Sequence, residues 1–180
     1  MGTDKGQLAL RSKPLIAFAI EALSKVAEET LIIANDPAYD AFGLPVYPDL
    51  YPETGPLGGI CTGLTHSKTE HNLVVSCDTP LVNSALLQHL LDNAEGSSLT
   101  VCSMKGALQP LVGMYAKSIE PGLKEHLLNG QLAMRKVVSQ MDHLEVEITE
   151  DLPFYHPDLF FNINRPEDLE NAKNLSPPGA

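Results

Sequence analysis

The sequence predicts a three-layer α/β/α protein in which a mainly parallel sheet lies between two layers of helices. Several short segments, among them 30–34 and 72–77, are largely apolar and rich in β-branched residues. Such segments are typical of strands that are buried on both faces of a parallel sheet. Segments in which apolar residues recur every three or four positions separate these strands and are typical of helices. Because strands and helices alternate along the chain, a sheet covered by helices on both sides is favoured.

The first helix is expected at 14–28, with Ser12 as its N-cap and Pro14 at an early helical position. Further helices are expected at 37–42, 60–67, 84–93, 119–128, 134–141 and from 165 onward. Strands are expected at 30–34, 44–47, 72–77, 99–103, 111–115, 144–148 and 160–164. Polar and apolar residues alternate in the strand at 144–148, which indicates an edge strand with one side in solvent.

Composition favours one domain, which we place at 1–173, followed by a flexible tail at 174–180. The formal net charge of −11 argues against a nucleic-acid partner. No apolar run approaches the roughly 20 residues of a membrane span, and a secretory leader pattern is absent, so we expect a cytoplasmic protein with no membrane partner. The 3 cysteines and 6 histidines are spaced neither as a disulfide framework nor as a zinc site.

Positive charge gathers near the start of this acidic chain. Lys5, Arg11 and Lys13 are three of only 12 basic residues. Such a concentration can mark an anion-binding site. It can also mark a solvated terminus, and on the charge alone the solvated terminus is the favoured interpretation.

The carboxyl ends of the strands are where ligands of such sheets bind. Asp78 directly follows the apolar segment 72–77 and is a candidate ligand for Mg²⁺, which takes one or two protein oxygens. A capping role in the following turn is the alternative. Asn164 ends another predicted strand, and Asn162 lies on the same face of it. These amides are either metal or ligand contacts or partners of the loop backbone.

A glycine-rich turn at 55–59 precedes a predicted helix, where backbone N–H groups can bind an anion. Lys5 offers a point charge to a phosphate group. Nucleophilic catalysis has little support, because Cys77 lies within a predicted buried strand and no histidine has an evident partner.

Taken in order, five stretches resemble the molybdenum cofactor guanylyltransferase family, also called molybdopterin-guanine dinucleotide biosynthesis protein A. They are MGTDKGQL, FGLPVYPDLYPETGPLGGI, LVVSCDTPLV, QPLV and FFNINRPEDL, and together they span nearly the whole chain. The resemblance implies a Rossmann-like fold of the nucleotidyltransferase type. It also implies an enzyme that transfers GMP from GTP to molybdopterin or molybdenum-molybdopterin, releasing pyrophosphate. Mg²⁺ is the implied cofactor, and other molybdenum cofactor biosynthesis proteins and molybdoenzymes are implied partners.

The same resemblance implies roles for single residues. Lys5 matches the phosphate-contacting lysine of the family and Asp78 its magnesium-binding aspartate, so these two are the expected catalytic residues. Asn35 and Asp49 match positions that hold the guanosine, and they complete the expected GTP site with Lys5 and Asp78.

The molybdopterin site is implied in the same way. Asn162 and Asn164 match an asparagine pair near the pterin and the metal, so Asn164 is expected to be a second metal ligand.

In the family, a first strand and a Leu-Ala-Gly-Gly-x-Ser-x-Arg loop precede the Met-Gly-x-Asp-Lys run. This sequence contains neither. A strand with its turn corresponds to roughly 15 residues. We therefore expect the chain as given to bind GTP poorly and to present unpaired strand edges.

Two other functions stay open at this point. A cytidylyltransferase that makes the cytosine dinucleotide would differ in only a few contacts to the base. A non-catalytic module that holds molybdopterin or docks on molybdoenzymes is favoured by the missing loop. The presence of Lys5, Asp78 and Asn164 disfavours it.

Overall fold

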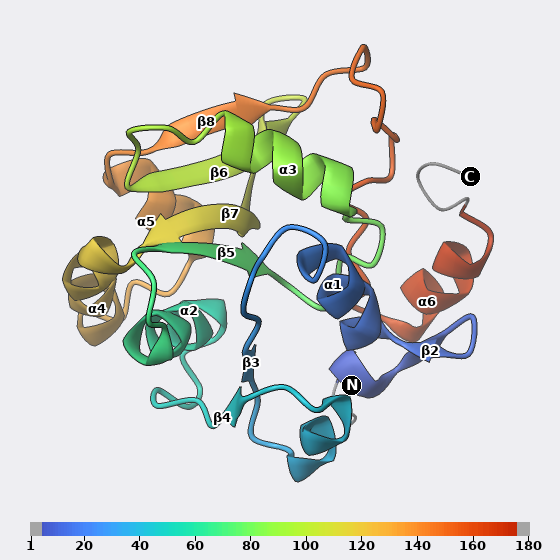
Figure 1. Ribbon diagram of the computed structural model, residues 1–180, viewed down its shortest axis with the longest axis horizontal. Helices are drawn as coiled ribbons and strands as arrows, with labels where there is room; N and C mark the ends of the chain where they lie inside the picture. Colours follow the sequence, from blue (N-terminus) through green and yellow to red (C-terminus); the bar gives the residue numbers. More distant parts are fainter. Residues whose placement is uncertain (1–4, 176–180) are drawn as a thin grey trace.

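The computed structural model describes residues 5–175. Residues 1–4, which begin the predicted anion-binding run, and residues 176–180 of the predicted tail lie outside the described part. The described chain forms a sheet with helices on both of its faces (Figure 1). The predicted three-layer α/β arrangement is thereby confirmed.

The central sheet has the strand order β5-β7-β6-β8, with bounds of His71–Val75 for β5, Ala107–Ala116 for β7, Leu99–Met104 for β6 and Leu144–Glu147 for β8. Strand β7 is antiparallel to both of its neighbours, whereas β6 and β8 are parallel. Three of the four strands therefore run in the same direction. Strand β8 lies at the edge of the sheet, as its alternating sequence predicted.

One face of the sheet packs against α2 (Pro56–His66), α4 (Glu120–Leu128) and α5 (Met134–Gln140). The other face packs against α1 (Leu15–Leu23) and α3 (Ser84–Asp92). Successive side chains of a strand point to opposite faces. In β6, accordingly, Leu99 and Val101 pack with the first group of helices and Cys102 with the second.

Two smaller sheets lie beside the central one. Strands β3 (Ile32–Ile33) and β4 (Val46–Tyr47) form a parallel pair, and β1 (Ala9–Leu10) and β2 (Lys13–Pro14) form a hairpin. Short 3₁₀ helices are η1 (Lys5–Gln7), η2 (Pro37–Phe42) and η3 (Lys117–Ile119), and the last helix is α6 (Pro166–Lys173). Within residues 5–175, neither small sheet is hydrogen-bonded to the central sheet.

The first helix is shorter than the predicted 14–28. Arg11 and Ser12 have positive φ angles of 50° and 63° in the β1–β2 turn, so Ser12 does not cap the helix. Helix α1 ends at Leu23, where the Ser24 hydroxyl donates to the carbonyl of Glu21 at 3.1 Å. A serine side chain that bonds the backbone in this way competes with continuation of the helix.

The predicted strand at 160–164 does not form. The N–H of Ile163 donates to the carbonyl of Asp78 at 2.8 Å, which is a single sheet-like bond. The N–H of Asn164 instead donates to the carboxylate of Asp168 at 2.9 Å, and the same carboxylate caps α6 by accepting from the N–H of Arg165 at 2.8 Å. Capping of the helix therefore uses the backbone groups that a strand would need.

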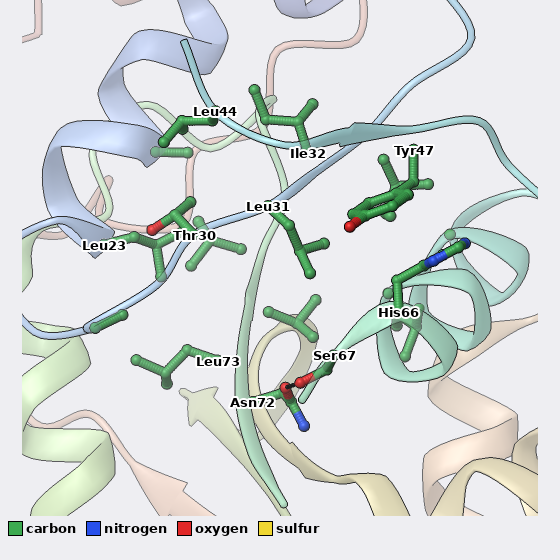
Figure 2. A pocket seen from close by; sticks show the side chains of 18 of the residues that line it. Leu23, Thr30, Leu31, Ile32, Leu44, Tyr47, His66, Ser67, Asn72 and Leu73 are labelled. Carbon is green, nitrogen blue, oxygen red and sulfur yellow. Dashed lines mark hydrogen bonds between the residues drawn. The ribbon is translucent and has the colours of Figure 1, made fainter. Parts of the chain in front are cut away.

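The two segments predicted to be fully buried strands are only partly buried. Ile32 is buried, but Leu31, Leu73, Val74 and Val75 are half-buried. These half-buried residues line a cavity between β3 and β5 (Figure 2). The part of the chain that the structure describes contains no helix that is both long and apolar enough to cross a membrane.

A hydrogen bond in the core offers a test of the packing. The fully buried Tyr115 donates its hydroxyl to the carbonyl of Pro110 at 2.5 Å, and burial raises the pKa of this phenol. We expect Tyr115→Phe to lower the free energy of unfolding by about 1–2 kcal/mol, because the buried carbonyl loses its donor. Urea denaturation measures this change, with Tyr47→Phe as the control at a half-buried tyrosine. If the Tyr115→Phe protein were as stable as the parent, the hydrogen bond from Tyr115 to Pro110 would not stabilise the core.

Candidate active site

Three segments that are far apart in the sequence meet beyond the carboxyl end of β5. Lys5 begins η1, Asp78 follows β5, and Asn164 lies just before α6. The ammonium of Lys5 donates to Oδ1 of Asn164 at 2.6 Å and lies 3.8 Å from Oδ2 of Asp78. The structure thus brings together three of the residues that the sequence singled out.

Asp78 is held in a fixed orientation. The residue is only 9% exposed, and its Oδ1 accepts a hydrogen bond from the Ser76 hydroxyl at 2.5 Å. Its backbone carbonyl is bound by the N–H of Ile163. The hydrogen bond to its side chain comes from Ser76, not from a backbone N–H of the following turn, which argues against the capping interpretation. The carboxylate is therefore fixed through one oxygen and directs the other toward Lys5.

Asn164 is placed by the start of α6. The carboxylate of Asp168 accepts from the N–H of Asn164, and the exposed side chain of Asn164 reaches Lys5. Asn162 lies two residues earlier and is exposed. It does not join this group of residues, so its predicted contact with molybdopterin stays a prediction.

A second polar group lies beyond the ends of β3 and β4. Oδ1 of Asn35 accepts from the N–H of Asp49 at 2.9 Å. Oδ1 of Asp49 accepts from the N–H of Tyr51 at 2.9 Å and from the hydroxyl of Thr62 at 3.0 Å. Thr62 belongs to α2 and is fully buried, so the helix fixes the position of Asp49. The two predicted guanosine residues are therefore neighbours.

The 3₁₀ helix η1 connects the two polar groups. Lys5 contacts the group at Asp78, while Nε2 of Gln7 donates to Oδ2 of Asp36 at 2.9 Å, next to Asn35. Between them, a Cβ added at Gly6 would lie 2.2 Å from the hydroxyl of Tyr39, so any larger residue there would displace the ring of this tyrosine. Both groups consequently lie along one edge of the fold.

The glycine-rich segment 55–59, which the sequence analysis placed in a turn before the helix, instead forms the N-cap and first turn of α2, and its glycines have separate roles. A Cβ added at Gly58 would lie 2.2 Å from Oγ1 of Thr54 and 2.8 Å from the carbonyl of Tyr51, so this glycine lets the loop pack on α2. Gly59 has open space around its Cα, and Gly55, with φ of 64°, begins the helix. The open positions can admit a ligand close to the backbone, as the sequence suggested.

Thiol chemistry is disfavoured. Burial raises the pKa of the Cys61 thiol to about 11 and that of Cys102 to about 12, so neither forms an appreciable amount of thiolate near neutral pH. Cys77 is half-buried beside the cavity between β3 and β5. The sequence analysis placed Cys77 within a buried strand, whereas it lies two residues after the end of β5, so that expectation was wrong.

Metal binding would depend on few protein ligands. In residues 5–175 no group of three or more His, Cys, Asp or Glu side chains could hold a metal ion. Asp78 and Asn164 supply hard oxygen donors next to each other through their common contact with Lys5. This donor set fits Mg²⁺, which is commonly held by one or two carboxylates together with waters and substrate phosphates.

Four residues of the site escaped the sequence analysis. They are Gln7, Thr62, Ser76 and Asp168, and each acts by holding another residue in place. The acidic residue three positions after Arg165 is a recognisable helix-start signal that could have indicated Asp168. Nothing in the small-residue helix around Thr62 marks that position.

Comparison with known proteins shows which family the chain resembles. The model of the MobA-like NTP transferase domain matches residues 1–145. A probable molybdenum cofactor guanylyltransferase of Flavobacterium johnsoniae is 35% identical over 178 residues, which cover 98% of this chain and 92% of the relative.

Solved structures show the same fold. Molybdopterin-guanine dinucleotide biosynthesis protein A from Archaeoglobus fulgidus superimposes with a TM-score of 0.77 at 24% identity, over 96% of this chain and 90% of the other. Rv0371c from Mycobacterium tuberculosis, solved as a complex with manganese, gives a TM-score of 0.70 at 14% identity, over 95% and 92%. At these identities the structural likeness concerns the fold alone, and the match of the family model confirms the predicted nucleotidyltransferase type.

Proposed function

The chain belongs to the family of MobA-like NTP transferases and is a nucleotidyltransferase, and from this premise we propose that it transfers GMP from GTP to molybdopterin or molybdenum-molybdopterin. The observation that carries the proposal is the meeting of Lys5, Asp78 and Asn164 at one edge of the fold. The description of the relative from Flavobacterium johnsoniae supports the choice of substrates.

The proposed reaction joins two phosphates. An oxygen of the terminal phosphate of molybdopterin forms a bond to the α-phosphorus of GTP. The bond from that phosphorus to the bridging oxygen breaks, and pyrophosphate leaves with the electron pair. Because the nucleophile is already an anion, a strong general base is unnecessary. The barrier lies in bringing two anions together and in the charge that develops on the leaving oxygens.

The charged and polar residues of the site would lower that barrier. Lys5 places a positive charge and hydrogen-bond donors next to the phosphates. Asp78 and Asn164 would hold a divalent cation, which we take to be Mg²⁺ and which supplies charge neutralisation when bound. Ser76 keeps the carboxylate of Asp78 oriented through its hydrogen bond at 2.5 Å.

The second polar group suits the guanosine. Oδ1 of Asp49 already accepts two hydrogen bonds, and its Oδ2 accepts none from the residues that the structure describes. We assign this oxygen, with Asn35 beside it, to the donor groups of the guanosine. Asn162 and Asn164, both exposed, are assigned to molybdopterin.

The guanosine assignment can be tested at Asp49. We expect Asp49→Ala to raise the KM for GTP by at least about 10-fold with a smaller change in kcat. The contact between Asp49 and the guanosine would be present both in the bound ground state and in the transition state, so its loss weakens binding of both equally. Steady-state kinetics measures both constants, and Asp40→Ala, at an exposed aspartate on η2, is the matched control. A KM for GTP within about two-fold of the parent value would show that Asp49 does not contact the nucleotide.

The reaction itself is tested by incubating the full chain with Mg²⁺, molybdopterin and either GTP or CTP. Chromatography detects the dinucleotide, and a coupled assay detects pyrophosphate. The proposal expects guanine dinucleotide from GTP and little product from CTP. Product from CTP alone would identify a cytidylyltransferase, and molybdopterin binding without product from either nucleotide would identify a non-catalytic module.

The proposal also includes the compartment of the reaction and its partner proteins. We place it in the cytoplasm, where GTP is supplied. We also expect other molybdenum cofactor biosynthesis proteins and molybdoenzymes to be partners that deliver molybdopterin or receive the product.

A further inference from the structure

Each side of the contact between Lys5 and Asn164 continues into a short element. The 3₁₀ helix η1, which begins with Lys5, leads into the β1–β2 hairpin, and Asn164 leads into α6. The hairpin and α6 lie side by side (Figure 1). They share a small core, here called the terminal core, whose buried members are Leu10, Leu15, Ile163 and Ala172. The packing of α6 on the hairpin therefore places the two parts of the site relative to each other.

The side chain of Arg11 fastens the carboxyl-terminal end of α6 to the turn of this hairpin. Its guanidinium donates to the carbonyl of Lys173, the last residue of α6, at 3.4 Å, and to the carbonyl of Leu175 just beyond. The last carbonyls of a helix have no partner within the helix. They also form the negative end of the helix dipole, which favours a nearby cation. Arg11 thus supplies both hydrogen-bond donors and a favourable charge to this end of α6.

The backbone of the turn is not the one that arginine prefers. Arg11 and Ser12 are the two central residues of the hairpin, and their φ angles are 50° and 63°. A two-residue turn in which both φ angles are positive favours asparagine followed by glycine. Unfavourable backbone conformations of other residues persist where the surrounding structure holds them, and they gather at functional positions. An arginine in this turn therefore indicates that its side chain does more than close the hairpin.

The other end of α6 adjoins the site. The carboxylate of Asp168 accepts from the N–H groups of Asn164 and Arg165 at 2.9 and 2.8 Å. Ile163 is fully buried in the terminal core, and its N–H donates to the carbonyl of Asp78 at 2.8 Å. A displacement of α6 would consequently move Asn164 relative to Asp78.

We propose that Arg11 is a positioning residue of the active site. By fastening the carboxyl-terminal end of α6 to the β1–β2 turn, it holds Asn164 within reach of Lys5 and Asp78. Arg11 is exposed and acts through α6, not on the substrate. Helix α6 has only 8 residues, so about two turns of helix connect the fastened end to the site. The effect of Arg11 on the reaction rests on the proposed function, whereas its effect on the position of α6 does not.

The variant Arg11→Asn, made in the full chain, separates the side chain from the turn. Asparagine tolerates a positive φ angle, so the hairpin is kept while the bonds to α6 are lost. The variant should melt no more than about 2 °C below the parent. Amide hydrogen exchange should become at least about 10-fold faster at Ile163, because the segment before α6 opens more often. Exchange should stay unchanged at Ile148, whose N–H bonds the carbonyl of Ser103 in the central sheet.

Kinetics adds a second measurement, at the substrates. Asn164 is assigned to molybdopterin and the cation, so Arg11→Asn should raise the KM for molybdopterin by at least about 3-fold. The Mg²⁺ concentration that gives half-maximal rate should rise by a similar factor. The KM for GTP at saturating Mg²⁺ should change by less than about two-fold, since Thr62 of α2 still holds Asp49.

Two further variants serve as controls. Arg11→Lys keeps a cation at the end of α6 and should restore part of the slow exchange at Ile163 and part of the affinity for molybdopterin. Lys25→Asn removes an exposed cation that follows α1. It should match the parent in melting temperature, in exchange and in kinetics.

Three outcomes would overturn the inference. Faster exchange at Asn174 and Leu175 with unchanged exchange at Ile163 would limit Arg11 to the end of α6. A lower melting temperature with faster exchange at Ile163 and Ile148 alike would make it a residue of general stability. An equal rise in the KM for GTP and for molybdopterin would show that it does not act through Asn164. Faster exchange confined to Ile163, in a protein whose parent transfers no GMP, would support the positioning role and count against the proposed function.

Discussion

Replacing Asp78 with alanine should lower kcat/KM for GMP transfer by at least about 1,000-fold while the protein stays folded. Its carboxylate is oriented by Ser76 and lies 3.8 Å from the Lys5 ammonium, at the point where the proposed cation and the phosphates would meet. Removing it takes away both the negative charge and the carboxylate oxygen that would hold the cation. Steady-state kinetics at saturating Mg²⁺ measures the loss.

Two further variants make the Asp78 result specific. Asp142→Ala removes an exposed carboxylate next to β8 and should leave both activity and melting temperature unchanged. Asp78→Asn keeps the size of the side chain, so a comparable loss there would assign the effect to the charge. If the Asp78→Ala protein keeps its circular dichroism spectrum and its rate of dinucleotide formation, Asp78 has no part in the reaction.

Replacing Lys5 with methionine should lower kcat/KM by about 100-fold or more, because the developing negative charge loses a fixed cation. Lys5→Arg should recover only part of the activity, since a planar guanidinium cannot reproduce the position of an ammonium point charge. Asp78 and Asn164 keep their oxygen donors in these variants, and Ser76 still holds Asp78, so the Mg²⁺ concentration that gives half-maximal rate should not rise.

Lys136 provides the control for this charge. It is exposed on α5, and Lys136→Met should be kinetically silent. A Lys5→Met protein with unchanged kcat/KM would place the phosphates elsewhere. A rise in the Mg²⁺ requirement would mean that Lys5 acts through the metal site instead of on the phosphates.

Sequence patterns predicted much of the fold and the main residues of the site. Local spacing of apolar residues placed α3 and β6 nearly at their observed bounds, because these elements depend on a periodicity that is visible within a short window. The sequence also placed Asp78 beyond the carboxyl end of a strand, where ligands of such sheets bind, and the structure shows it there. Its meeting with Lys5, 73 positions earlier in the printed sequence, was indicated by the family resemblance.

Other features depend on contacts that a local pattern does not contain. The segment 160–164 has the composition of a strand, yet the cap formed by Asp168 binds the backbone N–H of Asn164. The hydrogen bond from Thr62 to Asp49 depends on how α2 packs beside β4, which sequence periodicity does not specify. Sequence periodicity also does not specify the cavity beside β5. Leu73 and its neighbours line this cavity and are therefore only partly buried.

Titration calorimetry with a non-hydrolysable GTP analogue, in Mg²⁺ and in EDTA, examines whether a cation at Asp78 neutralises the phosphates. For the parent chain we predict binding at least about 10-fold tighter in Mg²⁺ than in EDTA, and for Asp78→Ala we predict that this difference disappears. Equal dependence on Mg²⁺ in the parent and in the variant would contradict a metal site at Asp78.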